Sequence, residues 1–134
     1  KSFEVPSDPN SRGAVVIKDV SVFSYCEHHM ALMYDMKVDV AYVPCGRVLG
    51  LSKIARICDM AAKRLQLQER LGRDIAEIIS IAAMSPDVGV RIEGCHSCMT
   101  SRGIKNVSSK TVTKNYLGAF KDDVSLQNLL GDRE

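Results

Sequence analysis

Long hydrophobic segments are absent from this sequence of 134 residues. No apolar run approaches the roughly 18–20 residues that a membrane-spanning helix needs, and the first ten residues contain no apolar stretch typical of a signal peptide. An excess of charge of one sign is absent too, because 18 basic residues face 16 acidic ones and leave a net charge of +2. Such a small charge does not favour a nucleic-acid-binding surface, so an anionic ligand would have to meet local clusters of cations.

Internal repeats, low-complexity stretches and an even set of cysteines are also lacking. Five cysteines cannot all pair within one chain, so a disulfide framework is not expected. We therefore expect a reducing, cytoplasmic setting and no contact with a membrane. The length and the hydrophobic content of 46% fit a single domain that spans residues 1–134 and buries its own core.

Hydrophobic periodicity predicts an α+β fold. Alternation with a period of two predicts strands, whereas apolar residues at steps of three and four, starting near Ser52, predict helices. Ser52 is a good candidate for the N-cap of the first helix. The order of strands, two helices and further strands indicates an antiparallel sheet with both helices on one face. The predicted strands cover 14–22, 36–43, 88–93 and 109–117. The first predicted helix begins at 52 and the second covers about 69–84, and the tail from 121 is expected to form a short helix or to be frayed.

Two short clusters hold all three histidines and three of the five cysteines. They read Cys26-Glu27-His28-His29 and Cys95-His96-Ser97-Cys98. Thiolates and imidazoles are the ligands that zinc prefers, so the clusters predict a zinc site that the fold closes. If only three side chains bind, a fourth position stays open for water, as in catalytic sites. The alternatives are a structural zinc, a pair of core histidines, or a disulfide formed after metal loss in oxidising conditions.

Five stretches of this sequence resemble the GTP cyclohydrolase I family. They occur in the family's order with nearly its spacing, over about residues 15–120, and together they are far more specific than any one of them. The stretches read SYCEHH (24–29), GLSKIARI (50–57), RLQLQERL (64–71), HSCMTSRGI (96–104) and SSKTVTKNYLG (108–118).

The resemblance implies a fold, an assembly and a reaction. The fold is the tunnelling fold, in which subunits pair their antiparallel sheets around a ring. The assembly is a homodecamer of two stacked pentamers, with active sites between subunits. In the reaction, GTP and water give formate and 7,8-dihydroneopterin triphosphate, the entry to folate or biopterin synthesis. The family usually carries helices before the first strand, and we expect the present chain to begin after them.

The resemblance also assigns the metal and the proton chemistry. Cys26, His29 and Cys98 match the zinc ligands of the family, and bound zinc would lower the pKa of the water that attacks C8 of guanine. His28 and His96 match the catalytic histidines, which would move protons because imidazole titrates near neutral pH.

Substrate contacts follow from the same match. Glu69 is the expected anchor of the base, since a carboxylate can accept both N1–H and the exocyclic amine of guanine. Gln68, beside it, is predicted to join the catalytic group as a second polar contact. The residues alone would indicate only a solvated helix start here.

The expected triphosphate contacts lie at the start of the first helix and after the second cluster. Ser52, Lys53 and Arg56 combine free backbone N–H groups with two cations, which suits an anion. Arg102 matches a further phosphate contact of the family. The charge pattern alone would equally fit a solvated face.

One departure from the family pattern lies between His29 and Ala41, where the chain is one residue longer. Residues 32–36 also lack the usual turn glycine, so we expect an altered turn there. Two other functions stay open. One is a non-catalytic, zinc-stabilised scaffold or regulatory subunit, and the other is a tunnelling-fold enzyme that acts on a pterin or a deazapurine.

Overall fold

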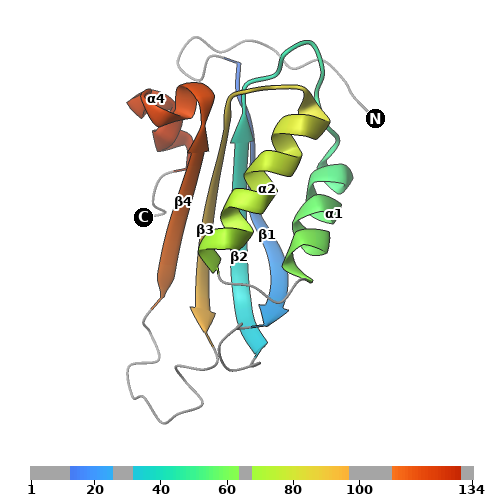
Figure 1. Ribbon diagram of the computed structural model, residues 1–134, viewed down its shortest axis with the longest axis vertical. Helices are drawn as coiled ribbons and strands as arrows, with labels where there is room; N and C mark the ends of the chain where they lie inside the picture. The colour runs from blue at the N-terminus through green and yellow to red at the C-terminus, as the bar shows by residue number, and fades with distance from the viewer. Residues whose placement is uncertain (1–12, 26–31, 64–67, 97–109, 131–134) are drawn as a thin grey trace.

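A four-stranded antiparallel sheet with two helices on one face forms the centre of the molecule (Figure 1). The computed structural model describes residues 13–25, 32–63, 68–96 and 110–130. The strands run in the order β1-β2-β3-β4, and the predicted α+β architecture is confirmed. Their bounds are β1 Val15–Tyr25, β2 Leu32–Tyr42, β3 Val88–His96 and β4 Thr111–Leu117, and the helices are α1 Leu51–Ala62 and α2 Gln68–Ala83.

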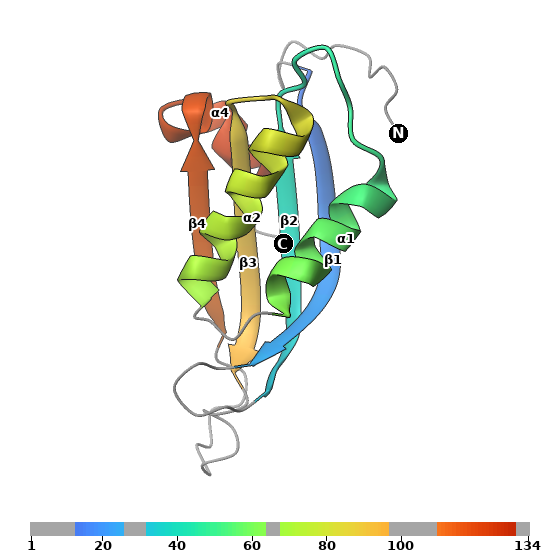
Figure 2. The same ribbon diagram turned by 45° about the vertical axis from the view of Figure 1, so that its right-hand side comes forward.

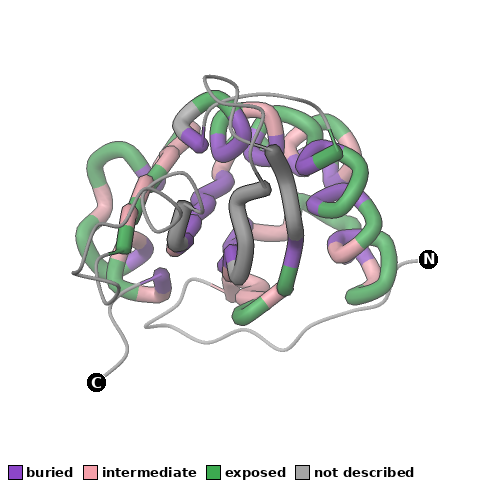
Figure 3. The backbone as a smooth tube through the Cα atoms, turned by 90° about the horizontal axis from the view of Figure 1, so that it is seen from below, coloured by how far each residue is buried: buried purple, intermediate pink, exposed green. Residues whose placement is uncertain are grey.

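The main core lies between the sheet and these two helices (Figure 3). It forms because β2 alternates, so that Met36, Val38, Val40 and Tyr42 all face the helices and are fully buried. The apolar stripes of both helices meet this face, as their period of three and four residues predicts. The helical side of the core includes Ile54, Ile57, Cys58, Ala61, Leu71, Ile75 and Ile79.

A second, smaller core lies on the other face of the sheet. Here the chain after β4 forms η1 (Gly118–Lys121), α4 (Val124–Gln127) and η2 (Asn128–Leu130). Figure 2 shows α4 behind the upper part of the sheet, away from α2. Phe120, Leu126 and Leu130 are fully buried there against Ala41. The short helix expected after residue 121 is therefore confirmed. None of the described helices is long and apolar enough to cross a membrane.

The start of α1 corrects one prediction. Gly50, with extended backbone, is the N-cap, and Ser52 is already inside the helix. The carbonyl of Gly50 accepts from the amides of Lys53 and Ile54 at 3.1 and 3.2 Å. The reason is a tertiary contact, because the buried hydroxyl of Tyr42 accepts from the amide of Leu49 at 2.7 Å and fixes the chain just before the helix.

The altered turn predicted at residues 32–36 is also wrong. These residues belong to β2, which pairs with β1 and β3 on both sides of an irregularity. Tyr34 pairs with Cys95, and the next pair is Lys37 with Glu93. From the first pair to the second, β2 therefore advances by three residues and β3 by only two. A β-bulge absorbs one extra residue in this way without leaving the sheet. Residues 32–36 therefore lie in a strand with a bulge rather than in a turn.

Candidate functional site

The strand ends that flank both Cys/His clusters lie at one end of the sheet. Tyr25, the last residue of β1, pairs with Leu32, and Met33 pairs with His96 at the end of β3. β4 begins beside them, where Thr111 pairs with Gly94. The first cluster directly follows Tyr25 in the chain, and the second begins on β3 itself. The strand ends that lead into the two clusters therefore lie at the same end of the sheet, the lower end in Figure 1.

Several predicted site residues lie outside the described residues. These are Cys26, His28, His29, Cys98 and Arg102. The backbone of His96 belongs to β3 and that of Glu69 to α2, but their side chains are likewise outside the described part. Among the residues that the structure does describe, no group of three or more His, Cys, Asp or Glu side chains could hold a metal ion.

The start of α2 lies against this same end of the sheet through Gln68. Its side-chain amide donates to the carbonyls of Ile92, at 3.2 Å, and Thr111, at 3.1 Å. The hydroxyl of Thr113 accepts from it as well, at 3.3 Å. Gln68 is only 2% exposed, so both amide hydrogens are used inside the protein. These bonds connect the first residue of α2 to β3 and β4 together.

Two glycines allow this close approach of helix and sheet. A Cβ on Gly94 would lie 2.7 Å from Cγ of Met36 and 3.4 Å from Oε1 of Gln68. A Cβ on Gly72, one turn into α2, would overlap the side-chain amide of Asn115 on β4. Larger residues at either position would push the start of α2 away from the sheet. Sequence reasoning missed both glycines, because an isolated glycine gives no signal of what it faces.

The predicted phosphate contacts lie elsewhere in the chain. Lys53 and Arg56 are exposed on α1 and line a groove of about 280 Å³ between the two helices. The remaining lining residues are Ile57, Met60, Ile78, Ile81 and Ala82. Figure 1 shows that α1 runs downward and α2 upward, so the helices are antiparallel.

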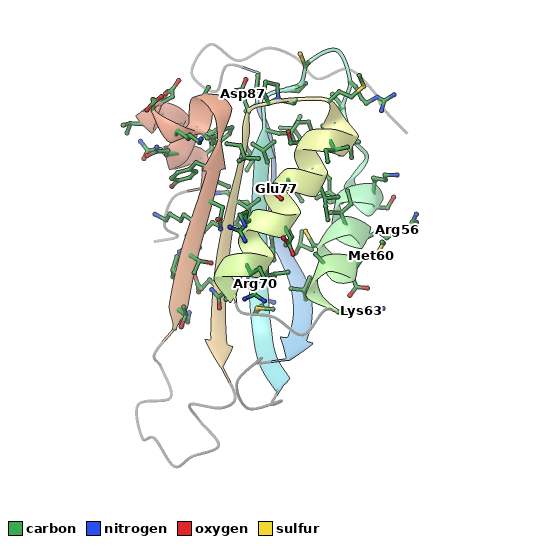
Figure 4. All side chains as sticks on the ribbon, in the orientation of Figure 1. Arg56, Met60, Lys63, Arg70, Glu77 and Asp87 are labelled. Carbon is green, nitrogen blue, oxygen red and sulfur yellow. The ribbon has the colours of Figure 1, made fainter. Side chains whose placement is uncertain are left out.

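Helix geometry gives the separation between the two groups of predicted contacts. Ala82, which shares the groove with Lys53, comes 14 residues after Gln68 in α2. At 1.5 Å per residue this is about 21 Å along the helix axis. Figure 4 shows Arg56 on α1 and, lower down, Arg70 in the first turn of α2. Within one chain, the structure does not bring Lys53 and Arg56 to the start of α2.

The N-terminus of α1 is open to an anion. No side chain caps it, and its first turn contains no acidic residue. Free amide groups and the helix dipole favour negative charge at such a position. Ser52 and Lys53 are both exposed there. Tyr42 supports this end through its bond to Leu49, and burial raises the pKa of its phenol.

Charged side chains form a chain of contacts on the sheet face opposite α1 and α2. Arg91 lies 3.1 Å from Glu93 and 3.9 Å from Asp39, and Lys110 lies 3.0 Å from Glu93. The hydrogen bond from Lys110, aided by Arg91, lowers the pKa of Glu93 against the effect of burial. This network ties the middle of β2 to β3 and reaches Lys110, the residue before β4. The alternation of the strands could have indicated it, since all three strand residues fall on one face.

Comparison with known proteins identifies relatives over nearly the whole chain. The profile of the family "GTP cyclohydrolase I" matches residues 1–132. GTP cyclohydrolase 1 of Ruminiclostridium cellulolyticum is 58% identical over 97% of this chain and 68% of its own length. The Clostridium beijerinckii protein of that name is 59% identical over 80% of this chain and 54% of its own length. GTP cyclohydrolase 1 of Clostridium botulinum (strain Loch Maree) is 54% identical, and this chain covers 62% of it. The chain thus spans between about half and two thirds of the length of these relatives.

Two solved structures share the fold. The archaeosine synthase QueF-Like superposes with a TM-score of 0.66 at 21% identity, covering 84% of this chain and 98% of that one. Dihydroneopterin aldolase of E. coli superposes with a TM-score of 0.55 at 16% identity, covering 76% of this chain and 97% of that one. At such low identity these likenesses concern the fold alone, and they confirm the predicted tunnelling-fold unit.

Proposed function

Because this chain belongs to the GTP cyclohydrolase I family, we propose that it carries the catalytic unit of a GTP cyclohydrolase I. The reaction opens the imidazole ring of the guanine of GTP with water, releases formate and leaves 7,8-dihydroneopterin triphosphate. The observation that carries the proposal is the single sheet end at which β1, β3 and the start of α2 meet. From that end the chain leads directly into both ligand clusters, and Gln68, held there, immediately precedes Glu69 in the chain.

We propose that Cys26, His29 and Cys98 hold one Zn²⁺. Two thiolates and an imidazole suit this ion and leave a coordination position open. Two strand pairings support this zinc site. Tyr25, just before the first cluster, pairs with Leu32, and His96, in the second cluster, pairs with the next residue, Met33. When bound, the ion would supply Lewis acidity that brings the pKa of a water toward neutrality.

The chain's own residues would recognise the base and move the protons. The carboxylate of Glu69 would accept N1–H and the exocyclic amine of guanine, a pair of donors that adenine does not present. His28 and His96 would take up and return protons at their imidazole nitrogens during ring opening and formate release. The position of Glu69 in the first turn of α2, next to the tightly held Gln68, supports a fixed place for the base.

We propose further that each active site lies between subunits of a homo-oligomer, which the family resemblance describes as a decamer. Lys53 and Arg56 of one subunit would hold the triphosphate, while another subunit would supply the base anchor and the metal ligands. The support is the separation of about 21 Å along α2 between these groups within one chain. Residues that bind one substrate must surround it, so they would converge through assembly.

A turnover assay tests the central proposal. Purified, zinc-loaded protein would be incubated with GTP, and the product would be oxidised and followed by neopterin fluorescence. We expect product and formate in equal amounts. Zinc-loaded, assembled protein that forms neither would contradict the proposal and favour a non-catalytic scaffold of the same fold.

A further inference from the structure

Gln68 immediately precedes the proposed base anchor in the chain, yet its own amide group is used inside the protein. It is 2% exposed and donates to two backbone carbonyls and one hydroxyl. A direct contact with the base would require the amide to leave these acceptors. The carbonyls of Ile92 and Thr111 would then lose a partner in a region sheltered from water, at a cost comparable to a lost hydrogen bond each.

The three acceptors come from the two strands that form the candidate site. Ile92 lies on β3, four residues before His96, and Thr111 and Thr113 lie at the start of β4. Gly94, between Ile92 and His96, avoids a clash with Met36, and a Cβ there would lie 3.4 Å from Oε1 of Gln68. The first residue of α2 is thus held against the part of β3 that directly precedes the second Cys/His cluster.

We propose that Gln68 is a positioning residue, which sets the place of Glu69 relative to His96 and does not itself contact the substrate. The inference rests on the proposed function, because it assigns Gln68 a part in the geometry of that site. The physical reason is that the base must be held with its C8 at the catalytic cluster, and a misplacement of about 1 Å can lower the rate about a hundredfold. Hydrogen bonds to two strands at once resist sliding of the helix start in either direction.

Thr113 provides a test that leaves Gln68 in place. Thr113→Val keeps the shape of the side chain but removes the hydroxyl that accepts from Gln68. Thr111→Val is the matched control on the same strand, because Thr111 accepts through its backbone carbonyl, which the substitution retains. Gln68→Met removes the amide altogether at similar length.

If Gln68 positions Glu69, Gln68→Met should lower kcat about 10- to 100-fold, with a smaller rise of KM. Thr113→Val should also lower kcat, but by a smaller factor, and Thr111→Val should leave kcat unchanged. The double variant of Gln68 and Thr113 should have the same kcat as Gln68→Met alone. Additive effects of Gln68→Met and Thr113→Val would show that the two residues act independently, and a change confined to KM would indicate that the amide contacts the substrate. Either result would overturn the inference.

Hydrogen exchange separates this inference from the proposed function. Gln68→Met and Thr113→Val should both speed amide exchange in the first turn of α2, whether or not the protein turns over GTP. Inactive wild-type protein would refute the proposed function alone. Active wild-type protein whose α2 start is equally protected in all variants would refute the positioning role alone. Circular dichroism and the oligomeric state would verify that each variant is folded.

Discussion

Two inactive variants of this protein should restore each other's activity when they assemble together. In the first variant, Lys53 and Arg56 are both changed to alanine, which removes the cations at the start of α1. In the second, Glu69→Gln replaces one acceptor of the base anchor with a donor. Lys53 and Arg56 line a groove that reaches Ala82, which lies about 21 Å along α2 from Gln68. We therefore expect each site to combine one set of residues from each of two neighbouring subunits.

The expected magnitude follows from counting interfaces. In a ring assembled from equal amounts of both variants, a site is intact only when the phosphate side comes from the Glu69 variant and the base side from the other. Random assembly gives this arrangement at about a quarter of the interfaces, so about a quarter of wild-type activity should return. If every site lay within one chain, no site would be intact.

A second mixture gives an independent measure of the fraction of intact sites. A chain that carries all three substitutions, mixed equally with wild-type chains, should give about a quarter of full activity if sites are shared between subunits, but about a half if each chain holds a whole site. The variants would be co-expressed with two different affinity tags and purified through both, and turnover would be followed by neopterin fluorescence. Doubly purified oligomers that show no activity in the first mixture, together with half activity in the second, would refute the shared site.

Three further predictions concern single side chains. Tyr42→Phe leaves the buried amide of Leu49 without its acceptor and should lower the free energy of unfolding by about 1–3 kcal/mol, with a rise in the KM for GTP because the start of α1 is less fixed; unchanged denaturant curves would contradict this role. Glu93 has a lowered pKa in the folded protein, so its stabilising effect should be complete above its unfolded pKa of about 4.3 and be lost as the pH falls through the folded value. Glu93→Gln should therefore weaken the dependence of the free energy of unfolding on acid pH. An identical dependence in both proteins would show that the pairing with Lys110 has no energetic effect. Cys98→Ser should lose zinc and activity together, because a serine hydroxyl is a poor zinc ligand at neutral pH; metal analysis that finds zinc retained would refute the assignment.

The sequence predicted those elements whose burial follows a local period. The alternation from Met36 to Tyr42 and the apolar stripe of α2 both place their residues in the core as expected. The errors fall where a distant contact decides the local structure. Ser52 has the chemistry of an N-cap, but the bond between Tyr42 and Leu49 places the start of the helix earlier in the chain. Residues 32–36 look like a turn in the sequence, yet pairing with both neighbouring strands keeps them in the sheet, with a bulge.

For the candidate site too, the sequence indicates the residue types but not how far apart they lie in the fold. Ligand chemistry is local, so the Cys/His clusters, the acidic step at Glu69 and the cations at Lys53 can be read directly from the residue types. The relation between them depends on the antiparallel arrangement of α1 and α2, which brings Lys53 beside Ala82 and away from Gln68. A sequence carries no signal of that distance, because neighbouring motifs in the chain can lie at opposite ends of a helix pair. If the proposed shared site is correct, the geometry that separates Lys53 from the start of α2 within a subunit would bring the two groups together only across an interface of the assembled protein.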